Sequence, residues 1–168
     1  MSAHVMADGA DGYRLVSGDE DVVGWVRGRV IGVTGFDDEA AAVSAAIRSH
    51  RELASWLARQ RLQPLPALDD GAPPRFVHDG AHRWLVVGRV QVARIPAASP
   101  HADDSRSHTF EIVLKGSVSE GMAIHAALVA LQAAHGPTEP ADFAVGRHRR
   151  GVPVSHGLAP TTYLDLEA

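Results

Sequence analysis

Residues 121–138 read GMAIHAALVALQAAHGPT and contain no aspartate, glutamate, lysine or arginine. Most of this stretch is predicted to be a helix that ends at Gly136. A surface helix normally carries a charged face, whereas this one has only His125, Gln132 and His135 for polarity. It is too short and too often interrupted by polar residues to span a bilayer. We therefore expect protein to cover this helix on more than one side.

Two kinds of cover fit this pattern, a second subunit or the chain that follows Gly136 folded back over the helix. Small side chains give the helix a smooth surface that another helix can approach closely. We favour a second copy, which predicts a homodimer. The predicted interface consists of alanines on this helix: Ala123, Ala126, Ala127, Ala130 and Ala134.

The composition is that of a globular protein with a hydrophobic core. Hydrophobic residues make up 45% of the 168 residues and the net charge is −4, so nothing attracts nucleic acid or an anionic membrane globally. The absence of cysteine excludes disulfides, thiolate nucleophiles and cysteine-ligated metals. The N-terminal residues lack a signal-peptide pattern. We expect a cytoplasmic protein without a membrane or nucleic-acid partner and without a cofactor.

Three segments are expected along the chain. Residues 1–12 are small, acidic and glycine-containing, which is typical of a disordered leader. Residues 13–146 are predicted to form a single α+β domain. Residues 147–168 are expected to be a proline-containing tail.

Strand and helix patterns alternate within that domain. Strands are predicted at 13–17, 22–34, 75–78, 83–95 and 109–115, with Gly88 as a bulge in the fourth. An amphipathic helix of about six turns begins near Asp37 or Asp38. A second helix is predicted after a capping box formed by Ser117 and Glu120. This order predicts a two-layer α+β fold with five or six antiparallel strands and two main helices on one face.

A possible internal repeat comes from aligning residues 35–47 with residues 116–128. At this offset of 81, a glycine, a glutamate and three alanines coincide. One interpretation is a duplicated ββα unit, with copies at 13–62 and 74–136. The other is coincidence, because alanine is common in this chain and strand–glycine–helix junctions are general.

The polar loop at residues 101–108 has the residue types of a hard-metal or hydrolase site. Two histidines and two aspartates form the candidate metal set: His101, Asp103, Asp104 and His108. Serines in the same loop add the components of a Ser–His–Asp relay. Because an exposed loop lacks the surrounding side chains that fix ligands, we expect no tight metal binding there. His78 and His82 flank the turn at Asp79-Gly80 and need a third ligand to bind a metal.

A second candidate site lies where a strand leads through glycine into the second helix. Free backbone N–H groups at a helix N-terminus attract anions. The candidate anion-binding residues are Lys115, Gly116, Ser117 and Ser119. Ordinary capping of the helix explains the same hydroxyl groups.

The element order from residue 51 to residue 135 resembles that of double-stranded-RNA-binding domains. It reads helix, three strands, alanine-rich helix, with strand 110–114 and the last helix as the best local features. The resemblance implies contacts to RNA phosphates through lysines at the start of the last helix. At that position this chain has Ser119, Glu120, Gly121 and Met122.

These patterns favour a non-catalytic, self-associating binding or scaffold module whose ligand is unknown. No residue is assigned a catalytic role. The first alternative is a small hydrolase or metal-dependent enzyme that uses the loop at 101–108. The second is a nucleic-acid-binding domain with the element order described above.

Overall fold

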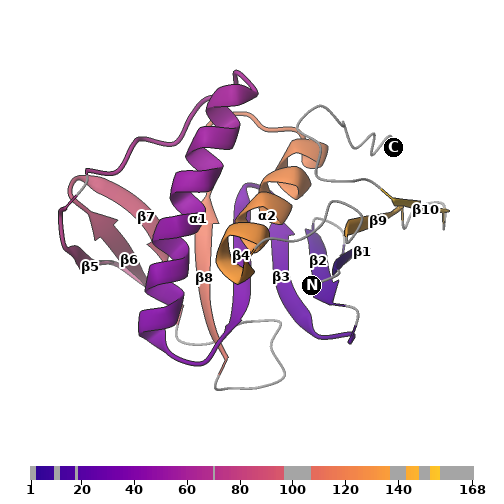
Figure 1. Ribbon diagram of the computed structural model, residues 1–168, viewed down its shortest axis with the longest axis horizontal. Helices are drawn as coiled ribbons and strands as arrows, with labels where there is room; N and C mark the ends of the chain where they lie inside the picture. Colours follow the sequence, from indigo (N-terminus) through magenta and orange to yellow (C-terminus); the bar gives the residue numbers. More distant parts are fainter. Residues whose placement is uncertain are drawn as a thin grey trace.

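Ten strands and two helices form the described part of the protein in this computed structural model (Figure 1). The structure describes residues 3–9, 12–17, 19–69, 71–96, 107–136, 143–147 and 152–155. The helices are α1 (Glu39–Arg59) and α2 (Glu120–His135). The strands are β1 (Ala3–Ala7), β2 (Gly12–Ser17), β3 (Val22–Arg27), β4 (Val30–Phe36), β5 (Pro74–Asp79), β6 (His82–Val87), β7 (Val90–Arg94), β8 (His108–Val113), β9 (Phe143–Arg147) and β10 (Val152–Ser155).

All ten strands belong to one open sheet, in the order β10-β9-β1-β2-β3-β4-β8-β7-β6-β5. Strands β1 to β8 pair with one another in antiparallel fashion, whereas β9 runs parallel to β1. Both helices pack against each other and against one face of the sheet (Figure 1). The prediction of an α+β fold with two layers is therefore confirmed.

Two segments that were predicted as single long strands are each a hairpin. The chain turns between β3 and β4 at Gly28, and between β6 and β7 at Gly88. Both glycines have positive φ angles, 56° and 62°, which suits the first central position of a tight two-residue turn. The predicted bulge at Gly88 was wrong, because a glycine inside an apolar run serves a turn as well as a bulge. Four strands rather than three therefore separate α1 from α2, which departs from the order in double-stranded-RNA-binding domains.

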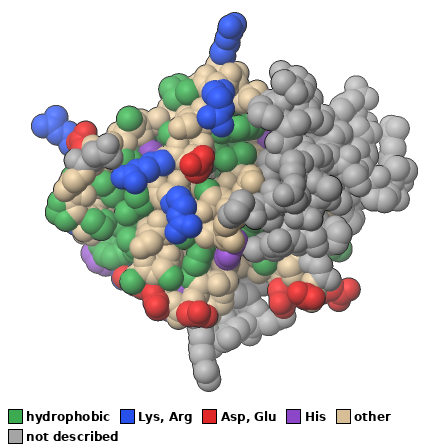
Figure 2. Space-filling view, in the orientation of Figure 1, with side chains coloured by type: hydrophobic (Ala, Val, Ile, Leu, Met, Phe, Trp, Pro, Cys, Tyr) green, Lys and Arg blue, Asp and Glu red, His purple; other side chains and the backbone are tan. Residues whose placement is uncertain are grey.

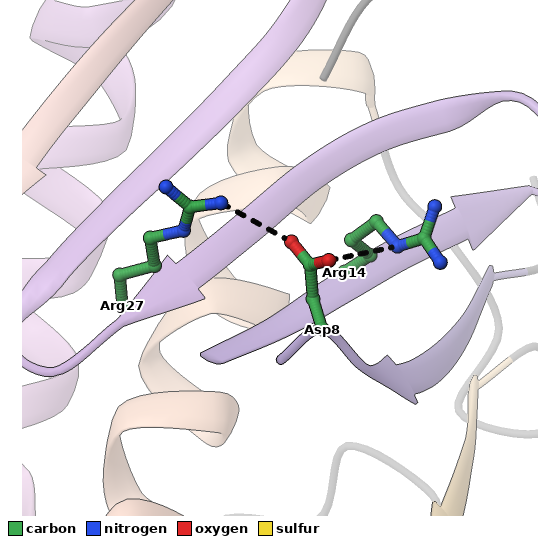
Figure 3. A network of polar contacts seen from close by, with 3 residues as sticks. All are labelled: Asp8, Arg14 and Arg27. Atoms are coloured by element: carbon green, nitrogen blue, oxygen red, sulfur yellow. Dashed lines mark hydrogen bonds and ion pairs between the residues drawn. The ribbon is translucent and has the colours of Figure 1, made fainter. Parts of the chain in front are cut away.

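The N-terminal residues differ from the predicted disordered leader. Strand β1 pairs with β2 and buries Ala3 and Val5, which are 0% and 1% exposed. Just after β1, the Asp8 carboxylate contacts Arg14 on β2 at 3.6 Å and Arg27 on β3 at 3.4 Å (Figure 3). Ala3 and Val5, at alternate positions of β1, supply the burial that holds the strand in the sheet.

Each helix begins at a capping side chain. Asp38 accepts a hydrogen bond from the Ala41 amide at 2.7 Å, as its position predicted. In α2 the cap is Ser119, which accepts from the Met122 amide at 3.4 Å. The prediction of a cap at Ser117 was wrong: the chain bends at Gly116, with φ 85°, and the helix starts only after Ser119.

The two helices meet through small residues on both sides. The Ser49 hydroxyl on α1 donates a hydrogen bond to the Ala130 carbonyl on α2 at 3.0 Å, and both residues are fully buried. Buried alanines lie on both helices: Ala42, Ala45 and Ala46 on α1, and Ala123, Ala126 and Ala127 on α2. Helix α2 is thus covered within one chain, since none of residues 121–135 is exposed. Neither described helix is long and apolar enough to cross a membrane.

Candidate functional site

A cavity of about 530 Å³ lies where the β5–β6 turn, the end of β7 and the start of β8 meet the first turn of α1. This volume falls within the range of about 300–1,000 Å³ that is typical of small-molecule sites. Its apolar lining includes Ala81, Ile95 and Pro96. Seven charged or titratable side chains complete the lining: Glu39, His78, His82, Arg83, Arg94, His108 and Glu111.

Local pairing of the strands brings these side chains together. Asp79 lies opposite His82, which closes the β5–β6 hairpin around Gly80 and leaves His78 and His82 at the same end of the sheet. Strands β7 and β8 pair at one position, where Arg94 lies opposite Glu111. The cavity therefore forms at an end of the sheet where strand pairing stops.

Both arginines of the cavity are paired with glutamates. Arg94 contacts Glu111 at 2.6 Å, and these side chains are 20% and 12% exposed. Arg83 contacts Glu39 at 2.5 Å. Burial raises the pKa of Glu111, and the positive charge of Arg94 only partly opposes this effect. The two ion pairs leave no net charge from these four residues.

Three histidines complete the polar lining, and the charge of one of them, His82, acts on Glu111 to lower the pKa of that carboxyl, against the larger effect of burial. His78 and His82 are exposed, and His108 is half-buried. Within the residues that the structure describes, no three histidine, aspartate or glutamate side chains are close enough to hold a metal ion. Imidazole N–H groups donate hydrogen bonds. The arrangement is therefore suited to holding an anion.

The predicted metal set falls mostly outside the described residues. His101, Asp103 and Asp104 are not among them, whereas His108 begins β8 and lines the cavity. The neighbouring Ser107 accepts a hydrogen bond from the Gly35 amide at 3.1 Å and lies 3.1 Å from the Thr34 hydroxyl. The Ser107 side chain therefore links the residue just before β8 to β4.

The predicted anion-binding residues are placed at the start of α2. Lys115 and Ser117 are exposed. The Gly116 carbonyl accepts from the Arg29 side chain at 3.1 Å, and Ser119 caps the helix. Glu120, the first residue of α2, receives a hydrogen bond from the Tyr13 hydroxyl. Two of the four residues thus have structural roles, and anion binding by the set stays a prediction.

The predicted interface alanines face their own chain. Ala123, Ala126, Ala127 and Ala130 are between 0% and 2% exposed, and Ala134 is half-buried. A second copy cannot reach the first four without displacing what already covers them. The homodimer stays a prediction, but these residues do not form an available surface for it.

Outside the cavity, the basic residues that the structure describes do not form a continuous track. Arg14 and Arg27 share the Asp8 carboxylate (Figure 3). On the helix face, basic side chains are interspersed with an acidic side chain and hydrophobic ones (Figure 2). This pattern gives no support to binding along a nucleic-acid backbone, which depends on clustered basic groups.

Comparisons with protein-family models, curated proteins and solved structures found no match for this chain. The site therefore rests on its own geometry.

The sequence did not reveal the ion pairs of the cavity. Glu111 lies on the face of β8 opposite Phe110 and Ile112, and strict alternation assigned that face to solvent. The available signal was an acidic side chain at the centre of an otherwise apolar strand. Its partner Arg94 lies across a loop, at a distance that no local pattern predicts.

Proposed function

We propose that this protein is a non-catalytic binding module that holds a small anionic ligand in the cavity between β5, β6, β7 and β8. One observation carries the proposal. Three histidines, from three different strands, surround a cavity in which both arginines are already paired with glutamates.

The charges of the lining determine the chemistry of the ligand. Because the charges of the Arg83–Glu39 and Arg94–Glu111 pairs cancel, the three imidazoles are the polar groups of the lining that remain to donate hydrogen bonds to a ligand. A phosphate or carboxylate group can then accept hydrogen bonds from several imidazole N–H groups. Ile95 and Pro96 provide contact for the apolar part of the same ligand.

Pairing of the two carboxylates argues against a role for either of them as a general base. A general base needs a group that is free to take up a proton within reach of the substrate. Glu39 and Glu111, the two glutamates lining the cavity, are each occupied by an arginine. The hydrolase or metal-dependent alternative is supported only by His108, which connects the predicted loop site to the cavity.

A thermal-shift screen with phosphate- and carboxylate-bearing metabolites tests the proposal. We expect at least one compound to raise Tm, because the imidazole N–H groups of the cavity donate hydrogen bonds to its anionic group. His82→Ala and His108→Ala should each reduce the shift, whereas Arg89→Ala, at an exposed turn residue, should not.

Two results, one from this screen and one from metal analysis of the purified protein, would contradict the proposal. One is a set of compounds whose shifts survive both histidine substitutions. The other is stoichiometric zinc or manganese in the purified protein that is lost in His108→Ala, which would favour the metal-dependent alternative.

We also propose that the chain is duplicated, in units of four strands and one helix. The caps Asp38 and Ser119 are 81 positions apart, as are the positive-φ glycines Gly35 and Gly116. At the same offset Ile31 lies opposite Ile112 in the sheet, and Ser49 contacts Ala130 between the helices. Equivalent residues that meet in this way support a local twofold axis through the centre of the domain. The proposed units are larger than the ββα units expected from the sequence.

A further inference from the structure

We propose that the free edge of β5 pairs in antiparallel fashion with β5 of a second copy of this chain, centred on Val77. The pairing would join two sheets across a twofold axis. It does not depend on the ligand proposed above. The argument rests on the exposure of the strand, the direction of its backbone groups and the order of its charges.

Strand β5 is the last strand of the sheet, and among the described strands it pairs only with β6. Every residue of β5 is exposed except the half-buried Val77. Phe76 is 36% exposed and is, with Met6, one of the two exposed large hydrophobic residues in the described chain. Hydrophobic side chains gather on this side of the helix face (Figure 2). An edge of this kind presents unpaired N–H and C=O groups to another strand.

The β5–β6 register shows which backbone groups point outward. The hairpin has a two-residue loop, so its closing pair, Asp79 and His82, is a hydrogen-bonded pair. Hydrogen-bonded and non-hydrogen-bonded pairs alternate along antiparallel strands. Phe76 and His78 therefore direct their N–H and C=O groups away from β6. Pro74 occupies the next outward position, where its missing N–H limits the pairing to the rest of the strand.

Pairing centred on Val77 provides hydrogen-bond partners for the outward N–H and C=O groups of Phe76 and His78. Phe76 then lies opposite His78 of the partner subunit, and the two symmetric pairs form four backbone hydrogen bonds. The same register places Arg75 opposite Asp79 of the partner subunit, which gives two pairs of opposite charge. Cross-strand pairs of these kinds stabilise antiparallel sheets.

Other symmetric registers are poorer. Centring on Phe76 places Pro74 at an outward pair, where no N–H is available. Centring on His78 moves Arg75 past the end of the partner strand and leaves Asp79 opposite an apolar residue. Only the register centred on Val77 matches the charges and the hydrogen-bonding positions together.

A contact within the chain orders the Phe76 side chain before the two copies associate. The Arg83 guanidinium lies 4.2 Å from the centre of the Phe76 ring, which holds the ring in place through a cation–π contact. A side chain that is already ordered loses less entropy when a partner binds.

Sedimentation equilibrium at tens of micromolar protein tests the dimer and its charge pairing. We expect a dimer whose dissociation constant rises roughly tenfold in Arg75→Asp and in Asp79→Arg, because like charges then face each other. The double exchange Arg75→Asp with Asp79→Arg should restore the wild-type value. Arg89→Asp, at an exposed residue in the β6–β7 turn, is the matched control and should change nothing. A monomeric wild-type protein, or single variants that dimerise as tightly as the wild type, would overturn the proposal.

Disulfide trapping tests the register independently, since the chain has no cysteine of its own. In a non-hydrogen-bonded antiparallel pair the Cα atoms are about 4.5 Å apart, within reach of a disulfide. We expect Val77→Cys to form a covalent dimer rapidly under mild oxidation and Arg89→Cys to do so much more slowly. Folded Val77→Cys protein that crosslinks no faster than Arg89→Cys would overturn this register.

Discussion

Ala130→Arg is expected to unfold the protein. Ala130 is fully buried, and its carbonyl accepts the hydrogen bond from Ser49 at the contact between α1 and α2. A guanidinium at this position has neither space nor a carboxylate partner in the helix contact. The cost of an unpaired buried charge, several kcal/mol, is comparable with the whole stability of a domain, about 5–15 kcal/mol.

Circular dichroism and urea unfolding measure this effect. Ala58→Arg is the matched control, because it introduces the same side chain at an exposed position near the end of α1, and it should retain the wild-type midpoint. If α2 instead presented its alanines to a second subunit, Ala130→Arg would give a folded monomer. A soluble variant with a wild-type unfolding midpoint would show that the helix contact has been misassigned.

Acid is expected to destabilise the protein through His50. This side chain is 1% exposed, and neither ring nitrogen has a hydrogen-bond partner among the described residues. Burial lowers the pKa of His50 from 6.5 to about 4, with smaller contributions from Lys115 and Arg51. Between these two pKa values, His50 is therefore mostly protonated in the unfolded state and mostly neutral in the folded state.

The sign and size of the pH effect follow from this difference in pKa. Above pH 6.5 both states hold His50 neutral, and no stability is lost. As the pH falls from 6.5 towards 4, the unfolded state gains the proton first, and the free energy of unfolding falls by about 1.4 kcal/mol per pH unit. The full shift corresponds to about 3 kcal/mol.

Urea unfolding at pH 7 and at pH 4.5 isolates the contribution of this residue. His50→Leu introduces the residue that stands at the equivalent position of α2, Leu131. Between the two pH values, we expect the free energy of unfolding to fall by about 2–3 kcal/mol less in the variant than in the wild type. The other titrating groups are common to both proteins and contribute equally. Equal acid losses in the two proteins would show that His50 is not the source.

The sequence predicted the fold class because its strongest patterns are local. Alternation in β8, the Asp38 cap and the end of α2 at His135 all follow from short-range chemistry. The strand count was too low partly because β1, β9 and β10 lie in segments for which no strand was predicted. It was also too low because Gly28 and Gly88 lie within apolar runs whose hydrophobicity continues through the turns. Neither run contains the Asn-Gly or Asp-Gly pair that marks a hairpin most clearly.

The sequence predicted that protein covers α2, but it did not predict which element does so. The alanines of α2 indicated close approach by another helix, and that helix is α1, whose own alanines lie on its buried side. The amphipathic pattern of α1 indicated that one side of this helix is buried, but it did not indicate which element lies against that side. No sequence rule shows that two alanine faces within one chain meet each other.

The candidate site depended on long-range pairing and was only partly predicted. His78 and His82 were recognised as neighbours across a turn, and His108 as part of a polar loop. Their convergence follows from β8 lying between β4 and β7 in the sheet. That strand order places residues from opposite sides of a long loop around one cavity.

Nuclear magnetic resonance of the histidine side chains tests the central proposal most directly. Inorganic phosphate, or any anion identified in the thermal-shift screen, is titrated at pH 6 while the imidazole C–H resonances are recorded and assigned by single substitutions. The account predicts that His78, His82 and His108 shift together with one dissociation constant, while the buried His50 does not. Resonances of these three residues that stay unchanged, or that shift with unrelated affinities, would contradict an anion site in this cavity.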